Sequence, residues 1–489
     1  MIANELHGTT VESFWASLSF ILAVVITQPI YTSFSDVLGR STPLYVSFLL
    51  FIVGSIVFAI ARNMTILIVG RIIQGLGAGG LDVLNEIILT DITNLKERPL
   101  YLGLFAIPMA GGGILGPILG AVFSEFSSWR WIGWVNLPIA AVGFLLSFLF
   151  LRLKPIDHSF RVKLQRLDWV GMLLFAVGST AFALPLSWAG AMYPWSSWRT
   201  IVPLVAGSIV LVGFGLYESK PAEPVFPYRI FQNRTALVTL IGAFIHGMVL
   251  YSVLLYAPLF FQAVFLETPI ESVISLLPLS VSTVAFSILS AVAVEVTRQY
   301  RWGIVFGWIL TACGVCLWAF WHQYSSLSAK SSFQVIAGMG IGTLFSLLVI
   351  PMQASVQHVD DTGLAVGILV SFRLFGGLIG LAISSAVFNN VFEHHITSLG
   401  ILPESVAILK DAREAIGFIP ALRSVDLQPE MMALILRTYR ESMKAIFLIM
   451  AGLGVVGFLT SLFTKNISLE KEDLGRQRLE ALSELVGSQ

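Results

Sequence analysis

Polar and ionisable side chains that could carry chemistry gather in one stretch of the chain that is otherwise apolar. The set consists of Arg71, Gln74, Asp82, Asn85 and Glu86. On a helix, at about 100° per residue, Asp82 lies about 20° from Arg71, and the others lie within about 60° of it. The spacing therefore predicts one polar stripe, which either lines a polar cavity or makes structural bonds to neighbouring helices.

The distances along this stripe limit what its members can do. Arg71 and Asp82 would lie about 16 Å apart along the helix axis, so they cannot pair directly. In an apolar medium each ionised group costs at least about 2.5–3.5 kcal/mol unless it faces a cavity or a partner. We favour a cavity for Arg71, and the sequence leaves both interpretations open for Asp82 and Glu86.

Two further ionisable groups, His246 and Arg373, also lie inside apolar runs. A charged or titratable group in such a run is a functional-site hypothesis by default. For His246 the alternative is equally plain, because one neutral imidazole is easily satisfied in a core. We include both residues in a predicted pathway for substrate or protons.

Signs of an enzyme are missing from the sequence. No nucleophile–base pair, metal-ligand cluster or phosphate loop in the right context occurs, so we expect no catalysis, metal or cofactor. The pattern Gly75-x-Gly77-x-x-Gly80 follows no predicted strand, and we interpret it as close helix packing. Lys plus Arg and Asp plus Glu number 29 each, which gives no basic excess for nucleic acid.

These polar groups must be positioned by helices that cross a membrane. Of the 489 residues 56% are hydrophobic and only 12% are charged, whereas soluble domains are about a quarter charged. About thirteen apolar runs have the length needed to span a bilayer, where each must be helical. The predicted spans are 14–33, 43–62, 64–90, 100–123, 131–151, 168–188, 199–217, 236–262, 270–294, 302–321, 331–353, 364–392 and 445–464. The sequence thus predicts an all-α polytopic membrane protein.

The charges in the connecting segments predict the orientation. One set of loops and the C-terminal tail hold 17 Lys and Arg residues, whereas the opposite short loops hold four. Because basic residues are retained on the cytoplasmic side, the first set is expected there. The long segment 393–444 then lies outside, with short surface helices near 405–416 and 429–443. Asn63, in the sequon Asn63-Met64-Thr65, is a glycosylation candidate on the outer side.

Several ordered motifs carry a family resemblance. Asp36 and Arg40 can pair across a turn that Gly39 permits. Gly112, Gly116 and Gly120 form one smooth helix face, and Pro117 interrupts its backbone bonding. Two further motifs lie at 129–138 (WRWIGWVNLP) and 167–171 (LDWVG). Together with Arg71-x-x-Gln74-Gly75, these segments resemble the major facilitator superfamily, and within it the fourteen-helix drug:proton antiporter branch common in fungi.

The resemblance implies a fold of two six-helix bundles that rock about a central site, with two extra helices between them. Mapped onto this chain, residues 14–151 give an N-terminal bundle of five helices, without a counterpart of the family's first helix. Residues 168–217 give the extra pair and residues 236–464 the C-terminal bundle of six. Residues 465–489 form a cytoplasmic tail.

The resemblance also implies a function. We expect a secondary active transporter that exports small hydrophobic compounds such as toxins, drugs or secondary metabolites, driven by the proton gradient alone. In this hypothesis Arg71 tunes a proton-carrying carboxylate, Asp82 or Glu86. The expected partners are substrate, protons and lipid, in a monomer of the plasma membrane or of a vacuolar or vesicle membrane. The alternatives are uptake, for example of a siderophore, and a degenerate or sensor relative that transports nothing.

Overall fold

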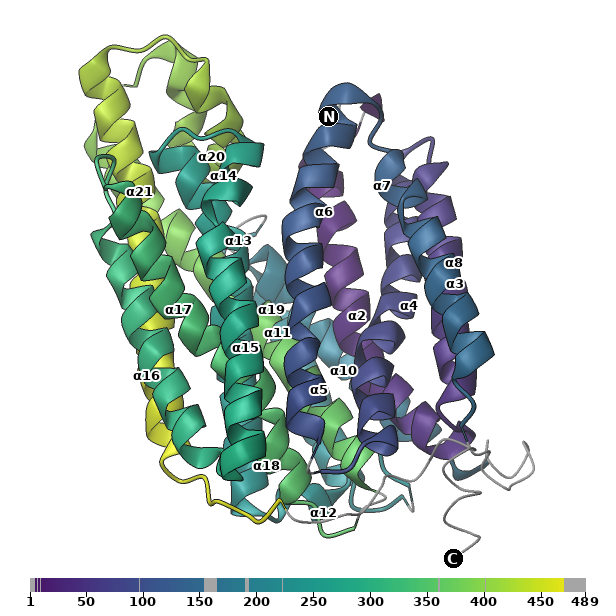
Figure 1. Cartoon of the computed structure of the whole chain (residues 1–489). Coiled ribbons are helices and arrows are strands. Elements are labelled where there is room, and N and C mark those ends of the chain that lie inside the picture. The colour runs from purple at the N-terminus through teal and green to yellow at the C-terminus, as the bar shows by residue number, and fades with distance from the viewer. Residues whose placement is uncertain are drawn as a thin grey trace, which may run out of the picture.

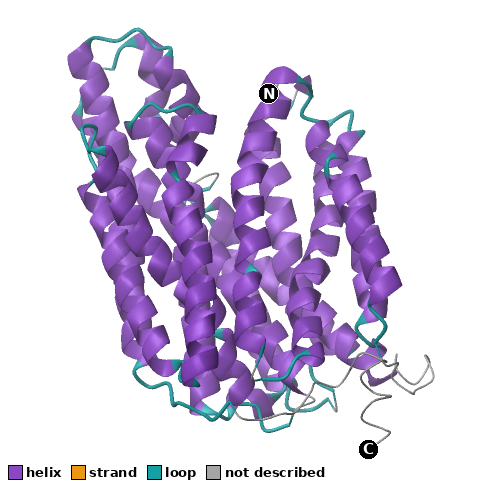
Figure 2. Cartoon of the chain, viewed as in Figure 1, coloured by secondary structure: helices purple, strands orange, loops and turns teal. Residues whose placement is uncertain are grey.

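The structure is a computed structural model and is helical almost throughout the residues it describes. These residues are 5–6, 8, 10–95, 97–153, 165–189, 193–221, 223–358, 361–400 and 402–469. Within them, thirteen helices are long and apolar enough to cross a membrane. Figure 2 shows these helices running side by side. The predicted all-α fold and the predicted number of spans are therefore confirmed. Residues 470–489 of the predicted tail lie outside the described residues.

The first group of helices, here the N-terminal bundle, precedes residue 151. Its members are α2 (Thr10–Leu38), α3 (Ser41–Ala59), α4 (Met64–Ile92), α5 (Arg98–Leu104), α6 (Ala106–Phe126), α7 (Trp131–Trp134) and α8 (Asn136–Phe150). Helices α2 and α3 both pack along α4. Gly75, Gly77 and Gly80 of α4 allow this, since an added Cβ at each would clash with α2 or α3. The interpretation of this glycine pattern as helix packing is confirmed.

Two helices, α10 (Trp169–Trp188) and α11 (Trp198–Tyr217), form a separate pair. They pack on each other, and α10 also contacts α2 and α19. Figure 1 shows this pair behind the two larger groups of helices, at the place where those groups meet. Side chains start both helices, because Asp168 accepts a hydrogen bond from Gly171 N at 2.8 Å and Ser197 accepts one from Arg199 N at 3.3 Å.

The second large group, here the C-terminal bundle, follows residue 227. Its main members are α12 (Tyr228–Phe231), α13 (Arg234–Val264), α14 (Pro269–Ser275), α15 (Leu277–Thr297), α16 (Arg301–Leu317), α17 (Leu327–Leu347), α18 (Val349–Ala354), α19 (Thr362–Ser398) and α21 (Pro429–Ser461). Helix α13 packs mainly on α19 and α21, and α17 packs on α15 and α16.

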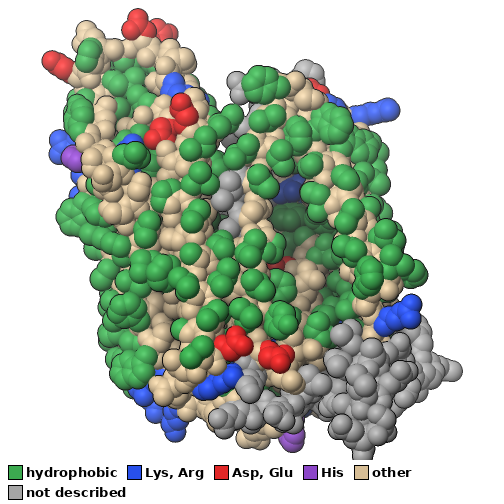
Figure 3. Space-filling model, viewed as in Figure 1, with side chains coloured by type: hydrophobic (Ala, Val, Ile, Leu, Met, Phe, Trp, Pro, Cys, Tyr) green, Lys and Arg blue, Asp and Glu red, His purple; other side chains and the backbone are tan. Residues whose placement is uncertain are grey.

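The two bundles meet along α5 and α6 against α15, and along α2 and α4 against α19. At the end predicted to be cytoplasmic, Ile87 of α4 and Leu364 and Ile368 of α19 belong to one buried cluster that spans both bundles. At the opposite end the space-filling view shows the two halves standing apart (Figure 3). The bundles are thus sealed on the predicted cytoplasmic side.

The external segment is shorter than the predicted 393–444. Helix α19 continues to Ser398 and α21 begins at Pro429. Both helices extend beyond their apolar cores because residues between them, here called the cap (399–400 and 402–428), cover their ends. Within the cap, Ala415 O accepts a hydrogen bond from Tyr439 at 2.6 Å, and Arg423 donates to Glu267 O at 2.8 Å. The predicted surface helix near 405–416 corresponds to η3 (Glu404–Lys410) and its neighbours, whereas 429–443 is the start of α21.

Candidate functional site

A polar chamber of about 910 Å³ lies between the two bundles. The N-terminal bundle supplies Asp82, Asn85 and Glu86 from α4, and the C-terminal bundle supplies Tyr251 and Arg373 among others. Four predicted pathway or stripe residues thus line one cavity, although Arg373 lies far from the other three in sequence. The chamber brings the acidic half of the predicted stripe into contact with the opposite bundle.

Glu86 and Arg373 are the charged pair that crosses the chamber. Glu86 Oε1 lies 3.8 Å from Arg373 Nη1, and the two side chains are only 13% and 6% exposed. Arg373 also donates to Phe345 O at 3.2 Å, and its guanidinium carbon lies 4.8 Å from the centre of the Phe345 ring. Glu86 Oε2 and Arg373 Nε are buried without a partner among the described residues. The pair is therefore loose, and each charge retains unused hydrogen-bonding capacity.

Asp82 is held by a residue that the sequence analysis missed. Gln28 of α2 is fully buried and donates from Nε2 to Asp82 Oδ2 at 2.6 Å. The available signal was a polar amide inside the first apolar run, where polar side chains are rare. Gln28 orients Asp82 toward the chamber from the N-terminal bundle.

Arg71 does not face these carboxylates, so the hypothesis that it tunes Asp82 or Glu86 is wrong in its geometry. Its Nε donates to Ala16 O at 3.1 Å, its Nη1 donates to Gln74 at 2.8 Å, and its guanidinium covers the Phe20 ring at 4.2 Å. Arg71 lies three turns before Asp82 on α4, and its side chain turns toward α2. The basic partner of the acidic stripe is Arg373 instead.

His246 is fully buried next to the chamber but is absent from its lining. Its Nε2 donates to Ile341 O at 3.1 Å, and its ring centre lies 6.5 Å from that of Phe345. Nδ1 has no partner among the described residues. The structure therefore places His246 behind Phe345, where it supports the chamber wall.

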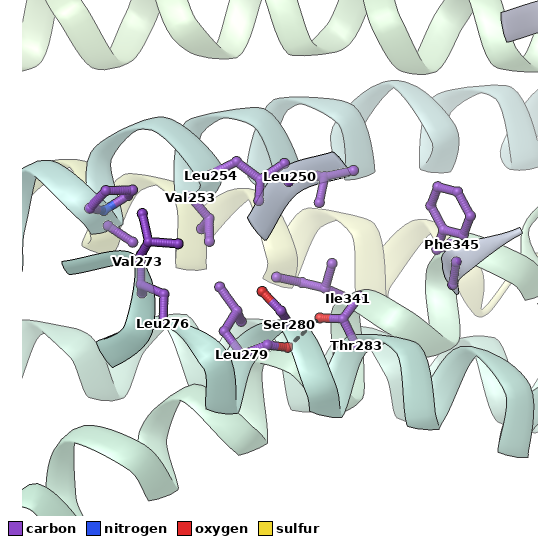
Figure 4. Close-up of a pocket in the computed structure, with 14 residues that line it drawn as sticks. Leu250, Val253, Leu254, Val273, Leu276, Leu279, Ser280, Thr283, Ile341 and Phe345 are labelled. Atoms are coloured by element: carbon purple, nitrogen blue, oxygen red, sulfur yellow. Dashed lines mark hydrogen bonds between the residues drawn. The ribbon is translucent and has the colours of Figure 1, made fainter. Parts of the chain in front are cut away.

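An apolar cavity of about 930 Å³ adjoins the polar chamber. Leu250, Leu254, Leu279 and Ile341 line it, and Figure 4 shows their side chains converging on the open space. Phe345 lines both this cavity and the polar chamber. Sequence reasoning could not single out this cavity, because its lining resembles any other apolar helix surface.

The predicted loop motif, which contains Asp36, Gly39 and Arg40, forms a buried ionic cluster at the predicted cytoplasmic end. Arg40 Nη2 lies 3.5 Å from Asp36 Oδ1, which agrees with the predicted pairing, and Gly39 has the positive φ of 97° that the turn requires. Arg40 Nε also donates to Asp91 at 2.8 Å. Burial alone would lower the pKa of Arg40, but Asp91 and Asp36 outweigh it, so this pKa is raised above its usual value. Arg40 is thus a permanent charge at the predicted cytoplasmic end.

The predicted antiporter motif lies on α6, which is continuous through Pro117. At Gly112, Gly116 and Gly120, no described atom lies within 4 Å of an added Cβ. The neighbouring Gly113 lines the apolar cavity. In this structure the smooth face of α6 has no packing partner among the described residues.

Asn63, the glycosylation candidate, caps α4 by accepting a hydrogen bond from Ile66 N at 2.9 Å.

Comparison with known proteins decides the family. The sequence profile of the Major Facilitator Superfamily matches residues 1–381. The chain belongs to the major facilitator superfamily. It is therefore a membrane transporter and not an enzyme. This major facilitator protein is 48% identical to the MFS-type transporter sphD of Aspergillus fumigatus, over 98% of this chain and 83% of that protein.

Two other similar proteins extend the comparison. The MFS-type efflux pump MMF1 of Pseudozyma antarctica is 34% identical over 96% of this chain and 86% of its own length. Among solved structures, the proton:xylose symporter XylE superimposes with a TM-score of 0.57 at 15% identity, over 98% of this chain and 90% of that chain. The structural likeness shows the fold alone.

Proposed function

We propose that this major facilitator transporter exports small hydrophobic molecules in exchange for protons. Glu86 and Asp82 carry the protons, and the apolar cavity lined by Leu250, Leu279 and Ile341 holds the cargo. The observation that carries the proposal is the loose Glu86–Arg373 pair, which joins the two bundles at the wall of the polar chamber. The name of one relative, an efflux pump, supports the direction of transport.

The pair offers a physical route from proton binding to movement. Glu86 belongs to the N-terminal bundle and Arg373 to the C-terminal bundle. Their attraction therefore favours the arrangement in which α4 and α19 lie close together. A proton on Glu86 removes that attraction and leaves Arg373 without its counter-charge. Because an unpaired charge in an apolar region is costly, the bundles then favour another arrangement.

The adjoining cavities explain how cargo could sense this change. Arg373 donates to the backbone oxygen of Phe345, and the Phe345 ring lines the apolar cavity. A change in the position of Arg373 therefore alters the wall against which cargo packs. The proton gradient is the only energy source required, and we place the transporter as a monomer in the plasma membrane.

A flux assay tests the proposal. Purified protein is reconstituted in vesicles that contain a pH-sensitive dye, and rhodamine 6G, cycloheximide and fluconazole are added in turn. With the wild-type protein, we expect at least one compound to drive protons across the membrane in the direction opposite to its own transport. Glu86→Gln and Asp82→Asn should abolish this exchange, whereas Glu404→Gln in the exposed cap should retain it.

The outcomes separate the alternatives. Protons and cargo moving in the same direction would indicate uptake and contradict export. Wild-type exchange in both Glu86→Gln and Asp82→Asn would remove these residues from the proton path. Folded protein that moves none of the compounds, and no proton, would favour a relative without transport.

A further inference from the structure

A third cavity lies away from the proposed proton and cargo sites, where the extra helix pair meets both bundles. It has a volume of about 580 Å³, and its walls come from α2, α10, α11, α13 and α19 and from the segment after α11. Five phenylalanines line it, namely Phe175, Phe226, Phe244, Phe372 and Phe375. None of its lining residues belongs to the polar chamber or to the apolar cavity.

The phenylalanine rings of this lining form two contacting groups. The ring centres of Phe175 and Phe226 lie 5.4 Å apart, and those of Phe226 and Phe372 lie 6.3 Å apart. In the second group, the ring centres of Phe244 and Phe375 lie 6.4 Å apart. Since aromatic rings pack best on flat, apolar groups in offset or edge-on contacts, the walls suit a flat ligand.

One polar group in this lining has no hydrogen-bond partner among the described residues. Ser179 of α10 is 1% exposed, and its Oγ makes no hydrogen bond with any described residue. Its neighbours behave differently, because Thr180 donates to Ala176 O at 2.6 Å and Ser371 donates to Gly367 O at 2.7 Å. A buried hydroxyl without a partner is costly, which makes Ser179 a candidate to bind a polar atom of a ligand.

We propose that this cavity binds a flat apolar molecule that carries a single hydrogen-bonding group, with the rings against its faces and Ser179 against its polar atom. A membrane sterol and a soluble polycyclic alcohol share this chemistry. The ligand touches α2 of the N-terminal bundle and α13 and α19 of the C-terminal bundle together. Its binding therefore stabilises this arrangement of the bundles.

The cavity also borders the helix that carries Arg373. Ser371, Phe372 and Phe375 of α19 line the aromatic cavity, whereas Val370 and Arg373 line the polar chamber. One helix thus separates the two spaces. A ligand in the aromatic cavity limits how far α19 can shift. The aromatic cavity is therefore a site for control of the transporter, and it is distinct from the cargo cavity.

Binding is measured on the full chain in lipid nanodiscs, without any transport. The two probes are the fluorescent sterol dehydroergosterol, supplied in the lipid, and 9-anthracenemethanol, supplied in solution. Ser179→Ala removes the hydroxyl and should weaken binding by about 3- to 10-fold, the effect of one hydrogen bond. Ser179→Leu fills the space and should abolish it. Ser208→Ala is the matched control, because the Ser208 hydroxyl is satisfied by Leu204 O at 2.7 Å.

A second variant and a second readout protect the test against misfolding. Val25→Phe fills the same cavity from α2 and should also abolish binding. The bound probe should raise the thermal unfolding midpoint of the wild type and of Ser208→Ala but not of the filled variants. Binding of the sterol alone or of the soluble alcohol alone supports the site and identifies the source of its ligand. Absence of saturable binding by both probes, or equal binding by the filled variants, overturns it.

Discussion

Glu86 and Arg373 are oppositely charged side chains that face each other across the polar chamber. Both are mostly buried, and each leaves one polar atom without a partner among the described residues. Removing one member of a buried ion pair leaves an uncompensated charge, which is more destabilising than removing both. The residues therefore need each other for stability, independently of transport.

A double-mutant cycle tests this dependence. Arg373→Met should lower the free energy of unfolding by about 3 kcal/mol, because it strands the Glu86 carboxylate. The double variant Arg373→Met/Glu86→Gln should recover much of that loss. The measurement is the unfolding midpoint in detergent for the wild type, both single variants and the double variant. Additive effects would show that the two side chains do not interact.

A pair of acidic residues lies at the predicted cytoplasmic ends of α10 and α11. Asp168 caps α10 and also accepts from the Tyr217 hydroxyl at 3.2 Å, while Glu218 accepts from Phe226 N at 2.7 Å. Asp168 Oδ2 and Glu218 Oε1 are buried without partners among the described residues. Burial, and then the charge of Asp168, raise the pKa of Glu218 to about 7. Arg166, two residues before Asp168, pairs with Glu223.

This pKa predicts a pH-dependent stability. The folded state holds a proton on Glu218 that the unfolded chain releases near its ordinary pKa of 4.5. Stability should therefore fall as pH rises from about 4.5 to 7 and then level off, because above pH 7 both states are deprotonated. Glu218→Gln should flatten this slope, and Glu404→Gln, in the exposed cap, should retain it. Thermal midpoints in detergent from pH 4.5 to 8 provide the measurement, and an unchanged slope in Glu218→Gln would refute the assignment.

At the scale of helices, apolar length predicted most of what the structure shows. The thirteen spans follow from runs too long and too apolar for any other location, and the glycines of α4 indicated its close packing. The polar stripe on α4 was also predictable, because its members share one helix. The contacts of Glu86 with Arg373 and of Asp82 with Gln28 could not be predicted from the sequence, since each contact joins residues of different helices. The site of Arg71 was misjudged for the same reason.

Two glycine-bearing helices should respond differently to substitution. An added Cβ at Gly376 of α19 would fall on the carbonyl oxygen of Phe244 in α13, whereas at Gly116 of α6 it meets no described atom. Gly376→Ala should therefore destabilise the protein by about 1–3 kcal/mol. Gly116→Ala should be neutral or should stabilise it by up to about 1 kcal/mol through helix propensity. Unfolding midpoints of the two variants decide this, and equal losses would mean that the face of α6 has a packing partner.

For the whole molecule, the buried cluster of Ile87, Leu364 and Ile368 fixes where the bundles are closed. The bundles touch there, while the opposite ends stand apart (Figure 3). A transporter that exchanges protons for cargo must also reach the reverse arrangement. Protonation of Glu86 is the step expected to favour it.

Spin labels can follow this movement. Labels at Phe126→Cys on α6 and Glu404→Cys on the cap, in a Cys313→Ser/Cys316→Ser background, report the separation of the outer ends; both sites are exposed. Lowering the pH should shorten this distance, and Glu86→Gln should shorten it already at neutral pH. The matched pair Tyr324→Cys and Glu404→Cys, both on the C-terminal bundle, should not change. A constant distance in the first pair at every pH would contradict the proposed coupling.

The cap is bound to the C-terminal bundle through the contacts of Tyr439 and Arg423, so we expect it to travel with that bundle as a rigid attachment. Gly417 within it has no neighbour among the described residues within 4 Å of an added Cβ. A short peptide epitope inserted there would face the exterior of intact cells, given the predicted orientation. An antibody fragment bound to it would add a rigid mass beyond the membrane, and would mark the C-terminal half in electron microscopy images of an otherwise featureless particle.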